Sequence, residues 1–527
     1  MDQNRRRLLI SLGYGAASVA TLGAISAVPN RDGERVDASG PVDPSVELGD
    51  ADVEVLGSTQ VGAVEPVVFD PARAADPSTL FDVVINGGRV MDPDSGFDRV
   101  MNVGVIGGAI GYVGAESLDG VQIIDAAGQV VSPGFIDILS YRPNAYGVWF
   151  KVADGVTSNL GMHGINNYAK PFFERFTNSV PVNFGGAFHH QFHRGLGIKA
   201  APDQPLAAGQ MVDFEALATE QLAGGFGGIA FSPEYAPGTT TEEMIRLGAL
   251  AGPQNGTLFF HVRHSDPDPP GTNAEAIAEV LEIAKATGRS VHISHITSTG
   301  GTFTMAETLA TVNAARAEGV DVTACLYPYD FWATRLQSLR FAGDWRSRFR
   351  IDYGNLQVGG TETILSADTF EQAKAENKLV AALGSIPLAD VDLAMQQPWT
   401  IIGSDAIADP DGNNHPRASG TFARTLGVYV RERNLLSLMD ALAKMTILPA
   451  RRTQSMLPAM GRKGRLQIGA DADITVFDPA TIIDRATVAT PARESAGIST
   501  VLVNGVPVLE GGVAQRDRLP GQPLRSV

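Results

Sequence analysis

The chain has 527 residues, of which 44% are hydrophobic, and it contains 58 glycines and 31 prolines. This composition is typical of a globular, loop-rich enzyme and excludes a disordered chain. A formal net charge of −17 at pH 7 argues against a nucleic-acid-binding protein, because phosphate binding requires clustered Lys and Arg. Cys325 is the single cysteine, so an internal disulfide framework is excluded.

The first 30 residues have the features of a targeting segment. Three arginines at positions 5–7 precede a weakly apolar run over residues 10–27, a pattern that resembles a twin-arginine export signal. The alternative is an uncleaved membrane anchor, which a Gly/Ala-rich run disfavours. Residues 31–80 are acidic and lack Lys, which is typical of a poorly ordered linker. We therefore expect an exported protein, periplasmic or extracellular, with no stable membrane span after removal of the signal.

Two strand-rich segments bracket the long middle of the chain. Short apolar runs in them carry Asn-Gly or Gly-Gly turns, which are hairpin signals. The expected strands cover residues 82–90, 103–108, 472–477 and 501–508. We predict that the terminal segments, residues 81–134 and 455–527, combine into one β-sandwich.

The middle segment, residues 135–454, alternates between helix and strand patterns. Thr240 and Glu243 form a capping-box signature that opens the first of these helices. Helices are expected over 240–250, 274–286 and 305–318, and strands over 257–261, 291–295 and 320–327. Repeated strand-helix units of this length predict an α/β fold with a (β/α)8 TIM-like barrel, whose active site lies at the carboxyl ends of the strands.

The polar residues that close the predicted strands are candidates for chemistry. All nine histidines lie between His163 and His415, inside the predicted barrel. His261 and His295 end successive strands and are expected to bind a metal ion, because imidazole is a common zinc ligand. Asp405 closes the apolar strand over residues 401–405, either as a core hydrogen-bond acceptor or as a carboxylate beside the metal.

Several motifs identify a family. Residues 133–137 read Pro-Gly-Phe-Ile-Asp and residues 154–158 read Asp-Gly-Val-Thr-Ser. Ser404-Asp405 is followed by His415-Pro416-Arg417 and by Gly420-Thr421-Phe422 with Arg424. From Phe81 to the C-terminus the chain resembles the N-acyl-D-amino-acid deacylase branch of the amidohydrolase superfamily. One departure is clear: Leu139 and Tyr141 stand where the superfamily normally carries a metal-binding His-x-His pair.

The resemblance implies roles for individual residues. Asp405 matches the catalytic acid/base, which also binds the metal weakly, and His261 and His295 match ligands of the tightly held metal. His190 resembles a substrate-contacting histidine, Tyr327 a carbonyl-polarising tyrosine, and Arg417 an arginine near the substrate carboxylate. The third ligand falls within residues 161–164, where His163 is the strong metal-binding side chain. The alternative to a ligand role is that His163 is an ordinary polar loop residue.

The implied activity is an exported, metal-dependent deacylase. One Zn²⁺ per chain, held by three histidines, would supply a metal-bound hydroxide, and Asp405 would transfer the protons. A one-metal mechanism does not need the His-x-His pair, and Tyr141 would partly fill the vacated space. The alternatives are a metal-free pseudoenzyme or ligand-binding barrel, and a hydrolase of another linear or cyclic amide. The expected partner is a small N-acyl amino acid; its acyl group, side chain and stereochemistry stay open, as does the oligomeric state.

Overall fold

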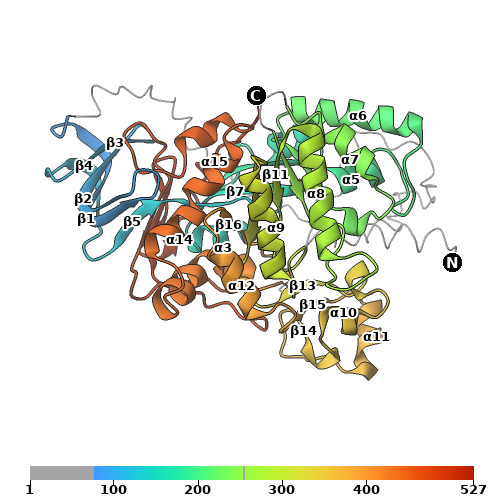
Figure 1. Cartoon of the computed structure of the whole chain (residues 1–527). Helices are drawn as coiled ribbons and strands as arrows, with labels where there is room; N and C mark the ends of the chain where they lie inside the picture. The colour runs from blue at the N-terminus through green and yellow to red at the C-terminus, as the bar shows by residue number, and fades with distance from the viewer. Residues whose placement is uncertain (1–75, 253–255, 412–413, 527) are drawn as a thin grey trace, which may run out of the picture.

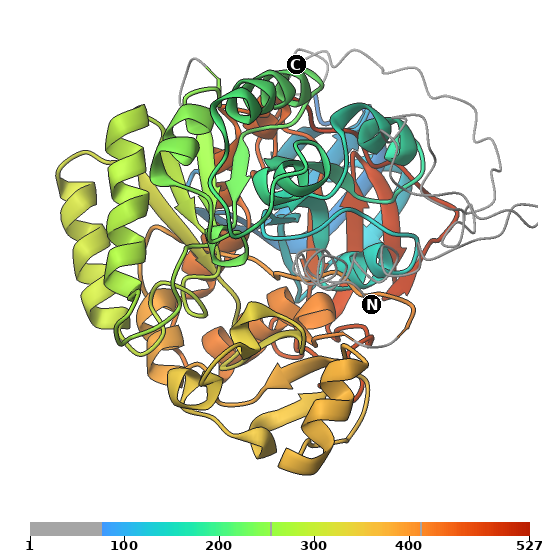
Figure 2. The same ribbon diagram turned by 90° about the vertical axis from the view of Figure 1, so that its right-hand side faces the viewer.

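A nearly closed barrel of parallel strands forms the centre of the protein (Figures 1 and 2). The computed structural model describes residues 76–252, 256–411 and 414–526, so the predicted export signal and nearly all of the predicted linker lie outside the described residues. Within the described residues the barrel has eight strands. These are β6 (Phe135–Asp137), β7 (Val156–Ile165), β8 (Asn183–His189), β9 (Ile229–Phe231), β10 (Thr257–Phe260), β11 (Ser290–Ile293), β12 (Val322–Leu326) and β16 (Thr400–Ile402). The predicted α/β barrel is confirmed.

The helices of the barrel follow the predicted alternation with its strands. They are α3 (Gly147–Ala153), α4 (Ala169–Phe176), α5 (His190–Leu196), α6 (Ala208–Ala223), α7 (Thr241–Gly248), α8 (Asn273–Thr287), α9 (Met305–Ala317), α12 (Leu388–Met395), α13 (Arg417–Arg424), α14 (Leu438–Met445) and α15 (Ile447–Thr453). The barrel strands are buried throughout, as expected for parallel strands that are covered on both faces.

One predicted helix start differs in detail from the structure. Thr240 Oγ1 accepts a hydrogen bond from the Glu243 amide at 3.1 Å and so caps α7. The Glu243 carboxylate does not return to the cap; it accepts hydrogen bonds from His190 and Arg194 instead. The capping box predicted there is therefore only half formed, because a tertiary ion pair recruits its carboxylate.

The two ends of the chain, for which the sequence predicted a shared β-sandwich, build one β-domain beside the barrel (Figure 1). Within the described residues its sheet has nine strands. These are β1 (Leu80–Asp92), β2 (Phe97–Ile106), β3 (Ala109–Gly114), β4 (Asp119–Asp125), β5 (Val130–Pro133), β17 (Ile474–Phe477), β18 (Ile498–Val503), β19 (Val506–Glu510) and β20 (Val513–Ala514). The antiparallel pairing of β5 with β17 joins the two segments, and their side chains share one hydrophobic core.

A small subdomain is inserted between β12 and β16, and the sequence did not predict it. It contains β13 (Trp332–Arg335), α10 (Trp345–Phe349), β14 (Leu356–Val358), α11 (Ala367–Ala375) and β15 (Leu379–Ala382). The strands form an antiparallel sheet in the order β13-β15-β14, which projects from one end of the barrel (Figure 1). We refer to residues 332–382 as the insertion. Among the described residues, no helix is long and apolar enough to cross a membrane.

Candidate metal centre and catalytic pocket

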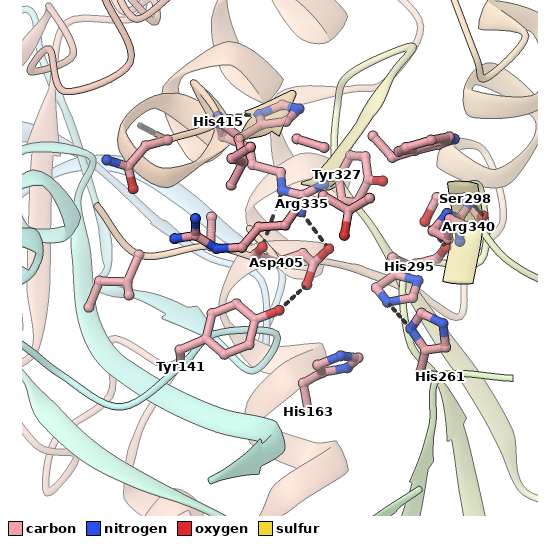
Figure 3. Close-up of a pocket in the computed structure, with 18 of the residues that line it drawn as sticks. Tyr141, His163, His261, His295, Ser298, Tyr327, Arg335, Arg340, Asp405 and His415 are labelled. Carbon is pink, nitrogen blue, oxygen red and sulfur yellow. Dashed lines mark hydrogen bonds and ion pairs between the residues drawn. The ribbon is translucent and has the colours of Figure 1, made fainter. Parts of the chain in front are cut away.

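Three histidines converge at the carboxyl ends of the barrel strands (Figure 3). His163 lies near the end of β7, His261 directly follows β10, and His295 lies two residues beyond β11. All three side chains are buried, and one ring nitrogen from each lies within 4.8 Å of the other two. The structure therefore brings together the three residues that were expected to bind the metal.

Hydrogen bonds to the outer ring nitrogens turn the inner nitrogens of two rings toward a common point. His261 Nε2 donates to the Glu234 carboxylate, and His295 Nδ1 donates to Thr299 Oγ1 at 3.2 Å. The inner atoms, His261 Nδ1 and His295 Nε2, lie 3.1 Å apart. Two nitrogens that bind one tetrahedral zinc ion at its usual bond length are about 3.3 Å apart. Three imidazoles are a donor set that zinc binds, and the separation of these two nitrogens fits zinc. The outer partners fix the required tautomers.

Burial keeps imidazole rings of this cluster neutral at pH 7. Burial lowers the pKa of His163 to about 4, and it lowers the pKa of His295 well below its usual value. A neutral imidazole is the form that binds a metal ion. At neutral pH the cluster is therefore ready to accept a cation without first releasing protons from these two rings.

Asp405 lies in the same pocket, but both of its carboxylate oxygens already have partners (Figure 3). Oδ1 accepts from the Tyr141 hydroxyl at 2.9 Å, and Oδ2 lies 2.8 Å from Arg417 Nη2. Burial acts to raise the pKa of Asp405, but Arg417 and the nearby imidazoles outweigh it and hold that pKa well below the usual range. Within the described residues, the candidate metal-binding cluster consists of the three histidines and does not extend to Asp405.

The backbone at the barrel seam positions Asp405. Its amide donates to the Leu139 carbonyl at 2.7 Å, and the neighbouring Ser404 amide donates to Asp137 Oδ1 at 3.1 Å. Lys151 Nζ lies 2.8 Å from Asp137 Oδ2 and 2.6 Å from Ser404 Oγ. These bonds join the first barrel strand to the last one and hold Asp405 at the pocket wall.

A family model described as "Amidohydrolase family" matches residues 240–509. An N-acyl-D-glutamate deacylase from Alcaligenes xylosoxydans xylosoxydans is 32% identical over 491 residues, which cover 84% of this chain and 96% of the relative. The chain belongs to the amidohydrolase family. The family resemblance deduced from the sequence motifs is thereby confirmed.

Solved structures of related amidohydrolases share this architecture. An N-acyl-D-glutamate deacylase from Bordetella bronchiseptica, complexed with zinc and a phosphonate inhibitor, superposes with a TM-score of 0.74 at 27% identity, covering 85% of this chain and all of that one. A D-aminoacylase studied for one-metal activation and second-metal attenuation of a binuclear centre gives a TM-score of 0.73 at 27% identity, covering 84% of this chain and all of that one.

Tyr327 and Arg417 line the pocket of this amidohydrolase. The Arg417 guanidinium lies over the Tyr327 ring, 4.5 Å from its centroid. Arg417 Nη1 and the Tyr327 hydroxyl are both buried without a hydrogen-bond partner among the described residues. Burial raises the pKa of Tyr327, so its hydroxyl stays protonated and can donate. Two unused donors therefore face a pocket that also holds the histidine cluster.

Leu139 and Tyr141 follow the Pro-Gly-Phe-Ile-Asp motif, and the structure places them differently. Leu139 packs in the apolar barrel core. Tyr141 lies in the pocket with its ring edge-on to His163, at a centroid separation of 6.0 Å. Burial raises the pKa of Tyr141 well above its usual value, so the hydroxyl remains a hydrogen-bond donor to Asp405.

The structure does not bring His190 to this pocket. Its ring is fully buried against Phe214 and Phe231, and Nε2 lies 2.7 Å from a Glu243 carboxylate oxygen. His190 is absent from the described residues that line the pocket. A neighbour of the cluster, Cys325, is also fully buried, and burial raises the pKa of its thiol, so the thiol stays protonated.

Two residues at the site were not found from the sequence. Glu234 lies in the short turn Pro233–Tyr235 after β9 and bonds to His261. Burial acts to raise the pKa of Glu234, but Arg340 and the bond from His261 outweigh it, so that pKa lies well below its usual range. Arg340, from the insertion, contacts Glu234 at 3.3 Å. Glu234 could have been identified from the sequence, because it is a carboxylate that follows an apolar strand. No sequence pattern marks Arg340.

Proposed function

We propose that this amidohydrolase cleaves the amide bond of N-acyl-D-amino acids with one zinc ion per chain. The observation that carries the proposal is the buried cluster of His163, His261 and His295 beside the carboxylate of Asp405. The deacylase relatives support the substrate class, because the chain covers 96% of the length of the N-acyl-D-glutamate deacylase. The zinc in the related deacylase structure supports the choice of ion.

The surroundings of Asp405 favour one metal ion over two. Tyr141 occupies one carboxylate oxygen and Arg417 the other. Leu139 supplies only apolar surface to the neighbouring core. A second cation would have to displace Tyr141 or Arg417 from a buried carboxylate, and it would gain no imidazole at residue 139 or 141.

Each pocket residue has its own role in the proposed amide hydrolysis. Zinc, when bound, lowers the pKa of water and polarises a carbonyl. Asp405 is placed to accept a proton from the attacking water and to return it to the departing nitrogen. Tyr327 is placed to donate to the oxyanion that develops on the substrate carbonyl. Arg417 Nη1 is free to bind a substrate carboxylate while Nη2 keeps its contact with Asp405. No substrate contact is assigned to His190, since it pairs with Glu243 away from the pocket.

The test is hydrolysis of a panel of N-acyl-D- and N-acyl-L-amino acids, together with metal analysis of wild-type protein and a His261→Ala variant. We expect about one zinc per chain in the wild type, far less in the variant, and activity on the D series only. Negligible zinc in both proteins would instead support a metal-free binding barrel. Zinc binding without activity on the panel, but with activity on cyclic amides, would support the other hydrolase function.

Export is proposed from the sequence of residues 1–30, which lie outside the described residues. The arginines at positions 5–7 and the apolar run that follows them support a twin-arginine signal. Fractionation of cells should recover the protein outside the cytoplasm, and replacement of all three arginines by lysine should retain it inside.

A further inference from the structure

A buried network of side chains joins the metal-site ligand His261 to the insertion. The Glu234 carboxylate is its centre: one oxygen accepts from His261 Nε2, and the other accepts from Ser265 Oγ at 2.9 Å. Arg340 Nη1 contacts the first of these oxygens at 3.3 Å. The Glu234, His261 and Arg340 side chains are at most 10% exposed. A charged group with so little contact with water must be compensated by its protein partners.

Arg340 is held rigidly on the side of the insertion. Its guanidinium lies 4.5 Å from the Trp332 ring centroid and 4.7 Å from the Phe349 ring centroid. Its Nη2 donates to the Ser298 carbonyl at 2.9 Å, and Ser298 follows His295 in the loop after β11. Arg340 therefore contacts the partner of one metal-site histidine and the loop of another.

We propose that Glu234 and Arg340, the second of which the insertion supplies, are positioning residues that set the metal affinity of the site. The inference rests on the proposed metal centre. By accepting the Nε2 proton, Glu234 leaves the Nδ1 lone pair of His261 for the metal and fixes the orientation of the ring. Arg340 keeps the carboxylate in the required orientation. Partners of this kind are typically responsible for about 10–100-fold of metal affinity.

The chain contains a matched control for this arrangement. Glu243 accepts from His190 Nε2 at 2.7 Å and from Arg194 Nε at 2.9 Å. These three side chains are at most 2% exposed, and they are absent from the described lining of the pocket. The second trio therefore reproduces the histidine, glutamate and arginine contacts without a link to the metal-binding cluster.

The experiment measures the zinc dissociation constant of the full chain by competition with a chromophoric chelator. Three variants, Glu234→Gln, Arg340→Met and Glu243→Gln, are compared with the wild type, and the melting temperature of each metal-free protein is recorded. We expect Glu234→Gln to weaken zinc binding about 10–100-fold and Arg340→Met to weaken it in the same direction. Glu243→Gln should lower the melting temperature but change zinc affinity less than about twofold.

The outcomes separate this inference from the proposed function. If Glu234→Gln binds zinc as the wild type does, or if Glu243→Gln weakens zinc binding to the same extent, the inference is overturned while the hydrolase proposal stands. If the wild type binds zinc and the variants behave as expected, but no amide is cleaved, only the proposed function fails. A wild type that binds no zinc overturns both.

Discussion

Replacing Asp405 by Asn tests the central catalytic role in the proposed mechanism. The substitution keeps the size of the side chain and an oxygen that accepts from Tyr141, but it removes the negative charge and the ability to carry a proton. Positioned proton transfer contributes about 10²–10⁴-fold, so kcat on the best substrate of the panel should fall by that factor, or about 3–5 kcal/mol of barrier. Bound zinc should stay near one per chain, because the three-histidine cluster does not include Asp405.

The same substitution has a calculable effect on stability. The Arg417 side chain is 6% exposed and would lose its carboxylate partner. Removing one partner of a buried ion pair costs about 3–5 kcal/mol, and the remaining amide oxygen should keep the loss near the lower end. Asp484→Asn is the matched control, because Asp484 also lies beside an arginine and a tyrosine, Arg424 at 3.3 Å and Tyr329 at 3.5 Å, but outside the described pocket lining.

The assay therefore combines kcat, zinc content and the free energy of unfolding for both variants. Both should lose stability, and only Asp405→Asn should lose kcat. Retention of more than about a tenth of the wild-type kcat by zinc-loaded Asp405→Asn would refute the proton-transfer role. If both variants lose kcat, the fall in kcat of Asp405→Asn is explained by structural damage and not by the lost proton transfer.

Further predictions concern metal, pH and the barrel seam. His163→Asn should lose most of the bound zinc, as measured by elemental analysis; retention of a full equivalent would show that His163 is no ligand. Chelation should abolish hydrolysis and one equivalent of zinc should restore it, whereas activity of the metal-free protein would contradict the mechanism. Burial lowers the pKa of His193 to about 4, so the unfolded chain binds more protons below about pH 6.5 and the folded state loses stability as the pH falls from there toward 4. His193→Phe should reduce the slope of unfolding free energy against pH by about 1.4 kcal/mol per unit in that window; an unchanged slope would exclude this group. Lys151→Met leaves the buried Asp137 carboxylate unpaired and should cost about 3–5 kcal/mol of stability, and an unchanged melting temperature would contradict that estimate.

The barrel was predictable because its units are local in sequence. The expected strand over residues 257–261 and helix over 274–286 correspond to β10 and α8, with ends shifted by at most one residue. The insertion was not predictable, because its order β13-β15-β14 pairs segments that are distant in the chain. Short runs such as β13, which is only partly buried, carry no clear alternation. The β-domain was partly predictable. Its turns were recognisable in the sequence, but no local pattern specified the pairing of β5 with β17.

The site was predictable to the extent that it follows strand ends. His261, His295 and Asp405 each come just after an apolar strand, and the parallel barrel brings such positions together. His163 required the family motif, because β7 runs past it to Ile165. The contacts of Tyr141 with Asp405 and of Arg340 with Glu234 join residues 264 and 106 positions apart. No local pattern encodes either pair, which is why the hydrogen-bonding partners of the site emerged only from the structure.

The backbone at the pocket gives an independent reason to regard it as a functional site. His295 and Asp405 have φ angles of +33° and +50°, in the left-handed region that favours glycine. Such conformations cost of order 1–3 kcal/mol for other residues and persist where the surroundings enforce them. Glycine would relieve that cost at both positions but would remove the imidazole and the carboxylate. At these two positions the left-handed backbone therefore has a chemical consequence, because it directs an imidazole and a carboxylate toward one pocket.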